Sequence, residues 1–284
     1  MARGGGFRDL MRQQRHGSAM SEAVARRRVV KVEDQVTTFD DELVVEEPLE
    51  IRLDGTSLAV VMRTPGDDAE LALGFAITEG IVTTPDAIAD VVFLGEGRWD
   101  LVTVDDVSID PAQFQRNFYS TSSCGVCGKA SIDAIRVTGA TPPDGPVVSA
   151  DTILSMPPRL LERQAAFHST GGLHAAAAFG PSGDIVAVRE DVGRHNAVDK
   201  VVGQLARQTW PFPPLGLMVS GRVSFEITQK AAVAGISLIC GVSAASSLAV
   251  ELAEELGMTV IGFLREGAFT VYTGTQRISG LASL

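Results

Sequence analysis

Two cysteines offer the clearest covalent chemistry in this sequence: Cys124 and Cys127, within Cys124-Gly125-Val126-Cys127-Gly128. We expect a polar loop over residues 117–129 that leads into a short helix from about Lys129. A thiol at the start of a helix has a lowered pKa, because the helix amides and a nearby lysine stabilise the thiolate. The thiolate is the nucleophile in thiol exchange and in persulfide formation, so the pair suits both reactions.

A single CxxC motif allows four interpretations: half of a metal site, a redox pair, a sulfur carrier or a chance arrangement. Structural zinc needs about four ligands, and the motif supplies two. Cys240 ends an apolar stretch, and we expect it to be a small core residue. The histidines that could add ligands show no paired spacing: His168, His174 and His195. A thioredoxin-like redox motif would follow an early strand, whereas this motif lies in the middle of the chain.

Two segments of small residues follow expected strands and open expected helices: Ser220-Gly221-Arg222 and Ser243-Ala244-Ala245-Ser246. Backbone amides at such junctions can bind an anion, and Arg222 could clamp a phosphate. Neither segment is a Walker A loop or a GxGxxG fingerprint. The small residues could therefore serve only to form tight turns, although two junctions in succession favour a nucleotide-like ligand.

Residues 189–196 gather charged and imidazole side chains between an expected strand and an expected helix. One interpretation is that Asp191 caps the helix and the other charges are solvated. The alternative is a polar cleft. His174 lies in an alanine-rich stretch, where a hydrogen-bonded core histidine is more common than a catalyst.

These residues must be positioned by secondary structure that the sequence pattern also predicts. In the first part of the chain, Asp54-Gly55 predicts a hairpin between strands over residues 46–53 and 57–63. A helix follows from Pro65 to Gly80. Weaker strands are expected over residues 91–94 and 101–104.

The second half alternates strands with helices, which is typical of parallel crossovers. Expected strands cover residues 173–179, 185–189, 215–219, 237–241 and 258–264. Expected helices cover residues 154–164, 194–207, 225–235 and 246–256. The fold class is therefore α/β, with a mixed sheet flanked by helices and a smaller N-terminal α+β unit.

We divide the chain into four parts: a disordered basic tail over residues 1–28, an N-terminal α+β unit over 29–116, the CxxC loop with a short helix over 117–140, and the α/β core over 141–284.

Charge and composition limit the classes of partner. The net charge of the chain is −11, and an acidic body of this kind does not suit a nucleic-acid binder. No apolar run is long enough for a transmembrane helix, and the N-terminus lacks the apolar region of a secretory signal. We expect a cytoplasmic protein with no membrane association.

Several longer strings, in this order along the chain, resemble the FdhD family of sulfurtransferases. They are Glu46-Glu47-Pro48-Leu49, residues 62–68, Ser123 to Gly128, Gly172-Leu173-His174, residues 190–200 and Ser220-Gly221-Arg222. The resemblance covers about residues 30–284, so it is more specific than the CxxC motif alone.

The resemblance implies that the protein accepts persulfide sulfur from a cysteine desulfurase. It would pass the sulfur to the molybdenum (or tungsten) bis-pterin guanine dinucleotide cofactor, Mo-bis(molybdopterin guanine dinucleotide), which formate dehydrogenase requires. Cys124 matches the persulfide cysteine, and Cys127 matches a second, assisting cysteine. The family's cofactor-binding stretch falls on Phe269, Thr270, Val271, Tyr272, Thr273 and Gly274, and the aromatic rings there could stack on guanine or pterin.

The resemblance also implies a cytidine deaminase-like core and a homodimer. The chain lacks the H-x-E and P-C-x-x-C pattern of a working zinc deaminase, so we expect neither zinc nor deamination. A non-catalytic chaperone that binds the cofactor for formate dehydrogenase is the alternative function, and a CxxC zinc hydrolase is a further one.

Overall fold

The computed structural model describes residues 23–281 except 106, 108, 110–141 and 143. Its largest element is a six-stranded sheet in the order β13-β12-β11-β10-β8-β9. The strands are β8 (His174–Phe179), β9 (Ile185–Asp191), β10 (Gly216–Val219), β11 (Leu238–Gly241), β12 (Thr259–Arg265) and β13 (Ala268–Thr273). The central strands β10, β11 and β12 are parallel, and the outer strands run antiparallel to their neighbours.

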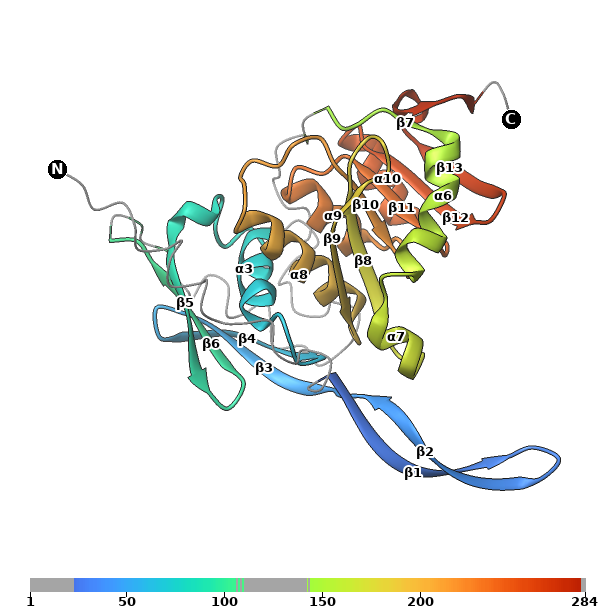
Figure 1. The fold of residues 1–284 in the computed structure, drawn as a ribbon. Coiled ribbons are helices and arrows are strands. Elements are labelled where there is room, and N and C mark those ends of the chain that lie inside the picture. Colours follow the sequence, from blue (N-terminus) through green and yellow to red (C-terminus); the bar gives the residue numbers. More distant parts are fainter. Residues whose placement is uncertain (1–22, 106, 108, 110–141, 143, 282–284) are drawn as a thin grey trace.

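Both faces of this sheet are covered by helices, because the central strands β10 and β11 are apolar and buried at every position. Alternate residues such as Leu217 and Ile239 point to one side, where α8 (Arg194–Ala206), α9 (Phe225–Val233) and α10 (Ser247–Glu255) pack. Their neighbours, such as Met218 and Cys240, point to α6 (Ala150–Leu161) on the other side. Figure 1 shows α6 and α8 on opposite sides of β8.

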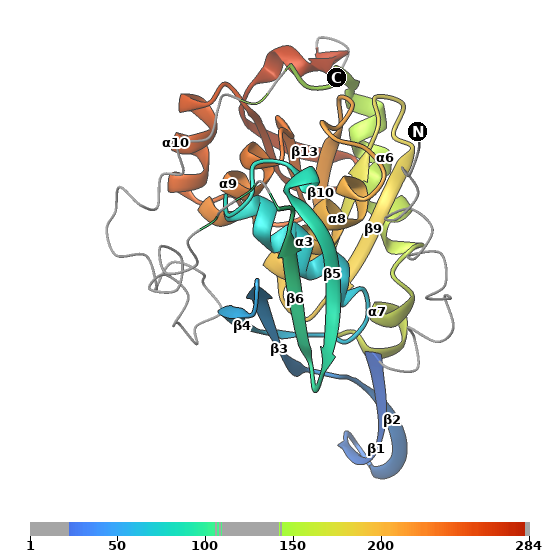
Figure 2. The same cartoon turned by 90° about the vertical axis from the view of Figure 1, so that its left-hand side faces the viewer.

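A second sheet forms the N-terminal unit, in the order β4-β3-β6-β5. It contains β3 (Glu47–Leu53), β4 (Thr56–Arg63), β5 (Ile88–Gly95) and β6 (Arg98–Thr103), and it packs on α3 (Asp68–Thr78). Figure 2 shows β5 and β6 in front of α3, with α8 and the larger sheet behind. Because α3 packs closely on α8, buried residues of both units form one continuous hydrophobic core.

The remaining described elements are short: the 3₁₀ helices η1 (Pro85–Ala87) and η2 (Thr275–Arg277), the helix α7 (Ala165–Thr170), and the paired strands β7 (Val148–Ser149) and β14 (Ile278–Ser279). No helix in the described part of the chain has the length and apolar content needed to cross a bilayer.

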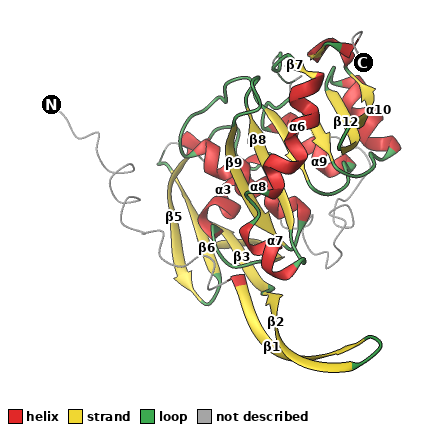
Figure 3. Ribbon diagram, turned by 45° about the vertical axis from the view of Figure 1, so that its right-hand side comes forward, coloured by secondary structure: helices red, strands yellow, loops and turns green. Residues whose placement is uncertain are grey.

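A long hairpin of β1 (Val24–Val32) and β2 (Val36–Val44) projects from the body near α7 (Figures 1 and 3). Residues 24–28 therefore belong to a strand, and their assignment to a disordered tail is wrong. The strand is paired antiparallel with β2 along its whole length, and several of its basic side chains face acidic ones across the ribbon. Arg26 lies opposite Glu42, and their side chains form an ion pair at 3.1 Å.

The prediction of a mixed sheet flanked by helices is confirmed. The helix expected over residues 194–207 is observed as α8, and its apolar face is buried: Val198, Val201, Val202 and Leu205. The predicted helix over residues 154–164 is observed as α6, which begins and ends earlier, and the chain turns after Leu161 before α7 begins at Ala165. The cytidine deaminase-like character of the core stays a prediction.

Candidate functional site

The two predicted strand–turn–helix junctions lie side by side at the carboxyl ends of β10 and β11. The first, Ser220-Gly221-Arg222, leads into α9, and the second, residues 242–246, leads into α10. Between them, the Val223 amide donates a hydrogen bond to the Ala244 carbonyl at 3.1 Å. The Arg222 side chain is exposed. One edge of the sheet thus carries the starts of two helices and a guanidinium, which suits an anionic ligand.

Most of the predicted cofactor-binding stretch forms the edge strand β13, and Tyr272 brings it to the second junction. A Cβ atom on Gly262 would lie 2.9 Å from Tyr272 Cε2 and 3.1 Å from the Ser243 carbonyl oxygen. The next residue, Phe263, has a left-handed φ of 52° and donates its amide to Ser243 at 3.0 Å. Such outliers are often found at functional sites.

The six residues of that stretch do not share one face. Tyr272 packs toward the α9 and α10 side of the sheet, whereas Phe269 and Val271 pack toward α6. Thr273 is buried and donates its hydroxyl to the Met258 carbonyl at 2.8 Å. Thr270 is exposed, and Gly274 ends the strand with a left-handed φ of 72°. Phe269 and Tyr272 could therefore not stack on the same ring from one side.

A group of polar side chains lies next to the first junction. His174, at the start of β8, is close enough to Gly221 that a Cβ there would lie 3.3 Å from its Nδ1 atom. His195 Nε2 lies 3.7 Å from a Glu226 carboxylate oxygen and 3.5 Å from Ser224 Oγ. These residues come from the starts of β8, α8 and α9, so three elements converge here.

Two side chains of this group, His174 and Glu226, have shifted pKa values. The shift favours the neutral form of His174 and the ionised form of Glu226. Burial lowers the pKa of His174, and the positive charges of Arg194 and His195 lower it further. Burial by itself would raise the pKa of Glu226, but its contacts with His195, with its own backbone amide and with the Ser224 side chain bring that pKa below the usual value. At neutral pH the site therefore presents a neutral imidazole and an ionised carboxylate.

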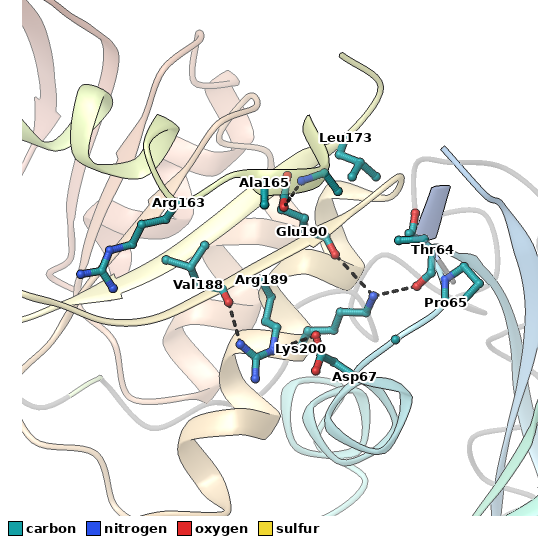
Figure 4. Close-up of a pocket in the computed structure, with 13 residues that line it drawn as sticks. Thr64, Pro65, Asp67, Arg163, Ala165, Leu173, Val188, Arg189, Glu190 and Lys200 are labelled. Atoms are coloured by element: carbon teal, nitrogen blue, oxygen red, sulfur yellow. Dashed lines mark hydrogen bonds and ion pairs between the residues drawn. The ribbon is translucent and has the colours of Figure 1, made fainter. Parts of the chain in front are cut away.

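The charged segment over residues 189–196 is half-buried, and its Asp191 is fully buried rather than solvated. Asp191 is 0% exposed and pairs with Lys200 Nζ at 2.7 Å. Its carboxylate also accepts hydrogen bonds from the amides of Thr64 and Gly193 at 3.1 and 2.8 Å. Figure 4 shows Lys200 between Thr64 and Glu190, beside a small cavity of about 150 Å³. The segment joins the loop before α3 to the start of α8. The N-cap of α8 is Gly193, and no side chain caps the helix, so capping by Asp191 and solvation of its charge are both wrong.

A larger cavity of about 830 Å³ lies on the α6 side of the first junction. Its lining includes Ser220 and His174 together with residues of α6 and α7. It also includes Gln164, a side chain that the sequence analysis did not select. Glu226 was missed as well, although an acidic residue in the first turn after Ser220-Gly221-Arg222 could have indicated it. Gln164 carries no such signal, because its neighbours in space come from distant segments.

The two cysteines of the CxxC motif, Cys124 and Cys127, lie outside the described residues. Cys240 is fully buried, and burial raises the pKa of its thiol to about 12. The prediction that Cys240 is a core residue is therefore confirmed. Within the described ranges, no three His, Cys, Asp or Glu side chains are grouped so that they could hold a metal ion. The absence of zinc stays a prediction.

Comparisons with known proteins give a consistent result. The model of the FdhD/NarQ family matches residues 44–279. The chain is 47% identical over 274 residues to the sulfur carrier protein FdhD of Streptomyces avermitilis, covering 92% of this chain and 97% of that protein. It is 48% identical over 282 residues to the protein of the same name from Mycobacterium tuberculosis, covering 92% and 100%.

One solved structure, described as a formate dehydrogenase accessory protein from Desulfotalea psychrophila, has a similar fold. Its TM-score is 0.74 at 21% sequence identity, and the match covers 90% of this chain and 99% of that one. At this identity the likeness concerns the fold alone.

Proposed function

The chain belongs to the FdhD/NarQ family, and we propose that it is a sulfur carrier required for formate dehydrogenase activity. In this proposal the thiolate of Cys124 attacks the outer sulfur of a persulfide on a cysteine desulfurase. A new S–S bond forms on Cys124, the old one breaks, and the desulfurase cysteine leaves as a thiolate. The carried sulfur then passes to the molybdenum bis-pterin guanine dinucleotide cofactor, with Cys127 assisting. The protein is thus a sulfurtransferase.

The observation that supports the proposal is that the two predicted cofactor-binding segments and the second strand–turn–helix junction converge at one edge of the sheet. Ser220-Gly221-Arg222, residues 242–246 and Tyr272 are far apart in the sequence, yet hydrogen bonds and close packing join them. A bis-guanine dinucleotide carries several phosphates, and helix starts with an exposed arginine suit them.

Glycines at this edge let its segments pack closely against one another. A Cβ atom on Gly241 would lie 2.6 Å from Val223 Cγ2, and one on Gly262 would lie 2.9 Å from Tyr272. Glycine at these positions lets the two junctions and β13 approach closely, which leaves the amides of the turns near the surface. The cofactor is cargo in this scheme, so the protein needs to hold it and present it rather than retain it.

The experiment is intact-mass measurement of the full chain after incubation with a cysteine desulfurase and cysteine. We expect a gain of one sulfur atom in the wild type and in Cys240→Ala, whose thiol is buried. We expect no gain in Cys124→Ala. A full gain in folded Cys124→Ala would refute the role of that thiol.

A second candidate is a non-catalytic chaperone that binds the cofactor and docks formate dehydrogenase. This candidate would use the two junctions and Tyr272 to hold the cofactor and would need no reacting thiol. An activity measurement in cells distinguishes the two candidate functions. If cells that carry the Cys124→Ala variant retain full formate dehydrogenase activity, the chaperone function is correct and sulfur transfer by that thiol is refuted. In either case we propose a cytoplasmic homodimer that contacts the formate dehydrogenase catalytic subunit.

A further inference from the structure

The hairpin of β1 and β2 extends away from the body of the protein (Figure 3). Several of its apolar side chains are exposed to solvent: Val30 by 60%, Val32 by 73% and Val36 by 69%. A two-stranded hairpin is only marginally stable in water without further packing. Exposed apolar side chains gathered on one projecting element are typical of a surface that binds another molecule. The hairpin is therefore a candidate docking element.

The edge of β1 is open to such a partner. In the part of the chain that the structure describes, β2 is the one strand that pairs with β1, whereas β2 also packs against α7. A Cβ atom on Gly172, just after α7, would lie 3.1 Å from Val44 Cγ1 at the base of β2. The pairing of β1 with β2 has no bulge, and β1 contains no proline. The edge of β1 therefore lacks two features that prevent a further strand from pairing.

The backbone groups that point out from this edge belong to the even-numbered residues of β1. At the base of the hairpin, the Val45 amide donates to the Ala23 carbonyl at 2.8 Å, and at the tip the Glu33 amide donates to the Gln35 carbonyl at 3.2 Å. Antiparallel pairs alternate between hydrogen-bonded and non-hydrogen-bonded ones, so the odd-numbered residues of β1 bond to β2. The amides and carbonyls that point outward are those of Val24, Arg26, Arg28, Val30 and Val32.

The side chains along this edge favour an acidic partner. Arg26, Arg27 and Arg28 are all exposed. Arg26 pairs with Glu42 and Arg28 with Asp40, but the two arginine side chains are 80% and 70% exposed. Ion pairs this exposed are weak, and each guanidinium has further donors to offer. A strand beside β1 would meet cations on both faces, because successive side chains alternate. Carboxylates on that strand would pair with the arginines, and β-branched side chains would pack on the valines nearer the tip.

We infer that β1 binds an extended segment of a partner protein, which alternates acidic with β-branched apolar residues and adds to the hairpin as a third strand. Hydrogen bonds to the outward amides and carbonyls supply affinity in this mode of binding, and side chains supply specificity. The three arginines repel basic segments, so they select the partner as well as attract it. Docking at this edge is independent of the chemistry proposed for Cys124.

Other occupants fit this edge less well. Two β1 strands paired about a two-fold axis through Arg27 would place Arg26 opposite Arg28, and like charges directly opposite are destabilising. Pairing of β1 from one copy with β2 from the next leaves open edges, so it gives an array that does not close. Residues 1–22 hold four arginines and two acidic residues, so their charge does not complement the edge. A nucleic acid would be repelled by Asp40 and Glu42, which lie across the hairpin from the arginines.

The test measures binding of a fluorescently labelled peptide to the full chain by fluorescence anisotropy. The probe is a capped peptide of alternating glutamate and valine, about eight residues long, which is enough to follow the open edge. The comparison peptide has lysine in place of glutamate. We expect saturable binding of the glutamate peptide and about tenfold weaker binding of the lysine peptide, with a difference that shrinks as the salt concentration rises.

Two variants test the edge itself. Val30→Pro removes an outward amide and leaves the hydrogen bonds between β1 and β2 in place, because proline is tolerated where the amide faces solvent. It should weaken binding of the glutamate peptide about tenfold. The matched control is Thr38→Pro, which makes the same change directly opposite Val30 on the β2 edge and should bind as the wild type does. Arg27→Gln/Arg28→Gln keeps every backbone group and should weaken binding about tenfold through the loss of charge.

Circular dichroism establishes that each variant is folded, and sedimentation velocity gives its oligomeric state. Weaker binding by Val30→Pro and by Arg27→Gln/Arg28→Gln, with binding by Thr38→Pro unchanged, is the expected result. Docking of an acidic strand on β1 is overturned if the glutamate peptide does not bind, if the lysine peptide binds as tightly, or if both folded variants bind as the wild type does. A loss of self-association confined to Val30→Pro would also overturn it, because that result assigns the edge to a second copy of the chain.

Discussion

The crossing of α3 and α8 predicts that an added methyl group on either helix will destabilise the protein. A Cβ atom on Gly74 would lie 1.8 Å from the Asp199 carbonyl oxygen, and one on Gly203 would lie 1.9 Å from the Glu70 carbonyl oxygen. Each glycine thus faces the backbone of the other helix. Because the obstacle is backbone, no change of side-chain rotamer can relieve the contact.

The size of the effect follows from these distances. Contacts shorter than 3.0 Å are essentially never made by real Cβ atoms, so Gly74→Ala must move the two helices apart by at least 1.2 Å. Overpacking of a core costs about 1–3 kcal/mol, and a clash with backbone is expected at the upper end. Alanine is favoured over glycine within a helix by about 1 kcal/mol. The net loss of unfolding free energy is therefore about 2 kcal/mol.

Urea denaturation followed by far-ultraviolet circular dichroism measures this loss as a lower midpoint. The matched control is Gly180→Ala, because a Cβ atom there meets nothing within 4 Å, and its stability should stay within about 0.5 kcal/mol of the wild type. The double variant Gly74→Ala/Gly203→Ala should lose less than the sum of the single losses, since the first methyl group already separates the helices. Stability equal to or above the wild type in Gly74→Ala would refute the close crossing.

Three further predictions concern charged and ligand-facing groups. Lys230→Met should cost about 3–5 kcal/mol, measured by thermal unfolding, because it leaves the buried Asp199 carboxylate without the ammonium that lies 2.9 Å away; a loss below about 1 kcal/mol would contradict this buried pairing. Burial lowers the pKa of His174 from 6.5, so the unfolded chain takes up a proton below that pH before the native protein does. Wild-type stability should therefore fall as pH falls through 6.5, and His174→Asn should flatten this part of the pH profile; an unchanged slope would contradict the shift. Arg222→Ala should weaken binding of guanosine diphosphate about tenfold without changing guanosine binding, and equal losses for both ligands in calorimetry would argue against a phosphate contact.

The second half of the fold could be predicted closely from the sequence. The expected helices over residues 225–235 and 246–256 are observed as Phe225–Val233 and Ser247–Glu255. They were predictable because short apolar runs, small-residue turns and amphipathic segments follow one another, and each signal is local. The edge strand β13 was not predicted, although it pairs antiparallel with the preceding strand β12 across a short turn. The pairing of β8 with β9 agrees with the strands expected over residues 173–179 and 185–189.

The hairpin of β1 and β2 shows where local signals fail. Its strands are mostly exposed and carry Arg26, Arg27 and Arg28 in succession, so no alternation of buried and exposed side chains marks a strand. The regular structure of β1 comes from its antiparallel pairing with β2, in which Arg28 lies opposite Asp40. A basic segment read alone has the composition of a tail.

The candidate site was predictable in its parts but not in its assembly. Small residues after strands identified the two junctions, because such turns expose amides wherever they occur. The cavity around Gln164 was not predictable, since its walls come from α6, α7 and the carboxyl ends of several strands. The CxxC motif lies outside the described residues, so its position relative to either feature stays a prediction.

The charged segment after β9 changes how loss of function should be interpreted in this protein. Asp191 and Lys200 are fully buried and hold the loop that contains Thr64, so they join the N-terminal unit to the core. Substituting either one leaves a buried charge unpaired, which destabilises the fold before it alters any ligand contact. Arg222 is exposed at the junction, and its substitution should leave the folded state intact. A defect in formate dehydrogenase maturation is therefore informative about chemistry for Arg222 variants, whereas for Lys200 variants it must first be separated from loss of folded protein.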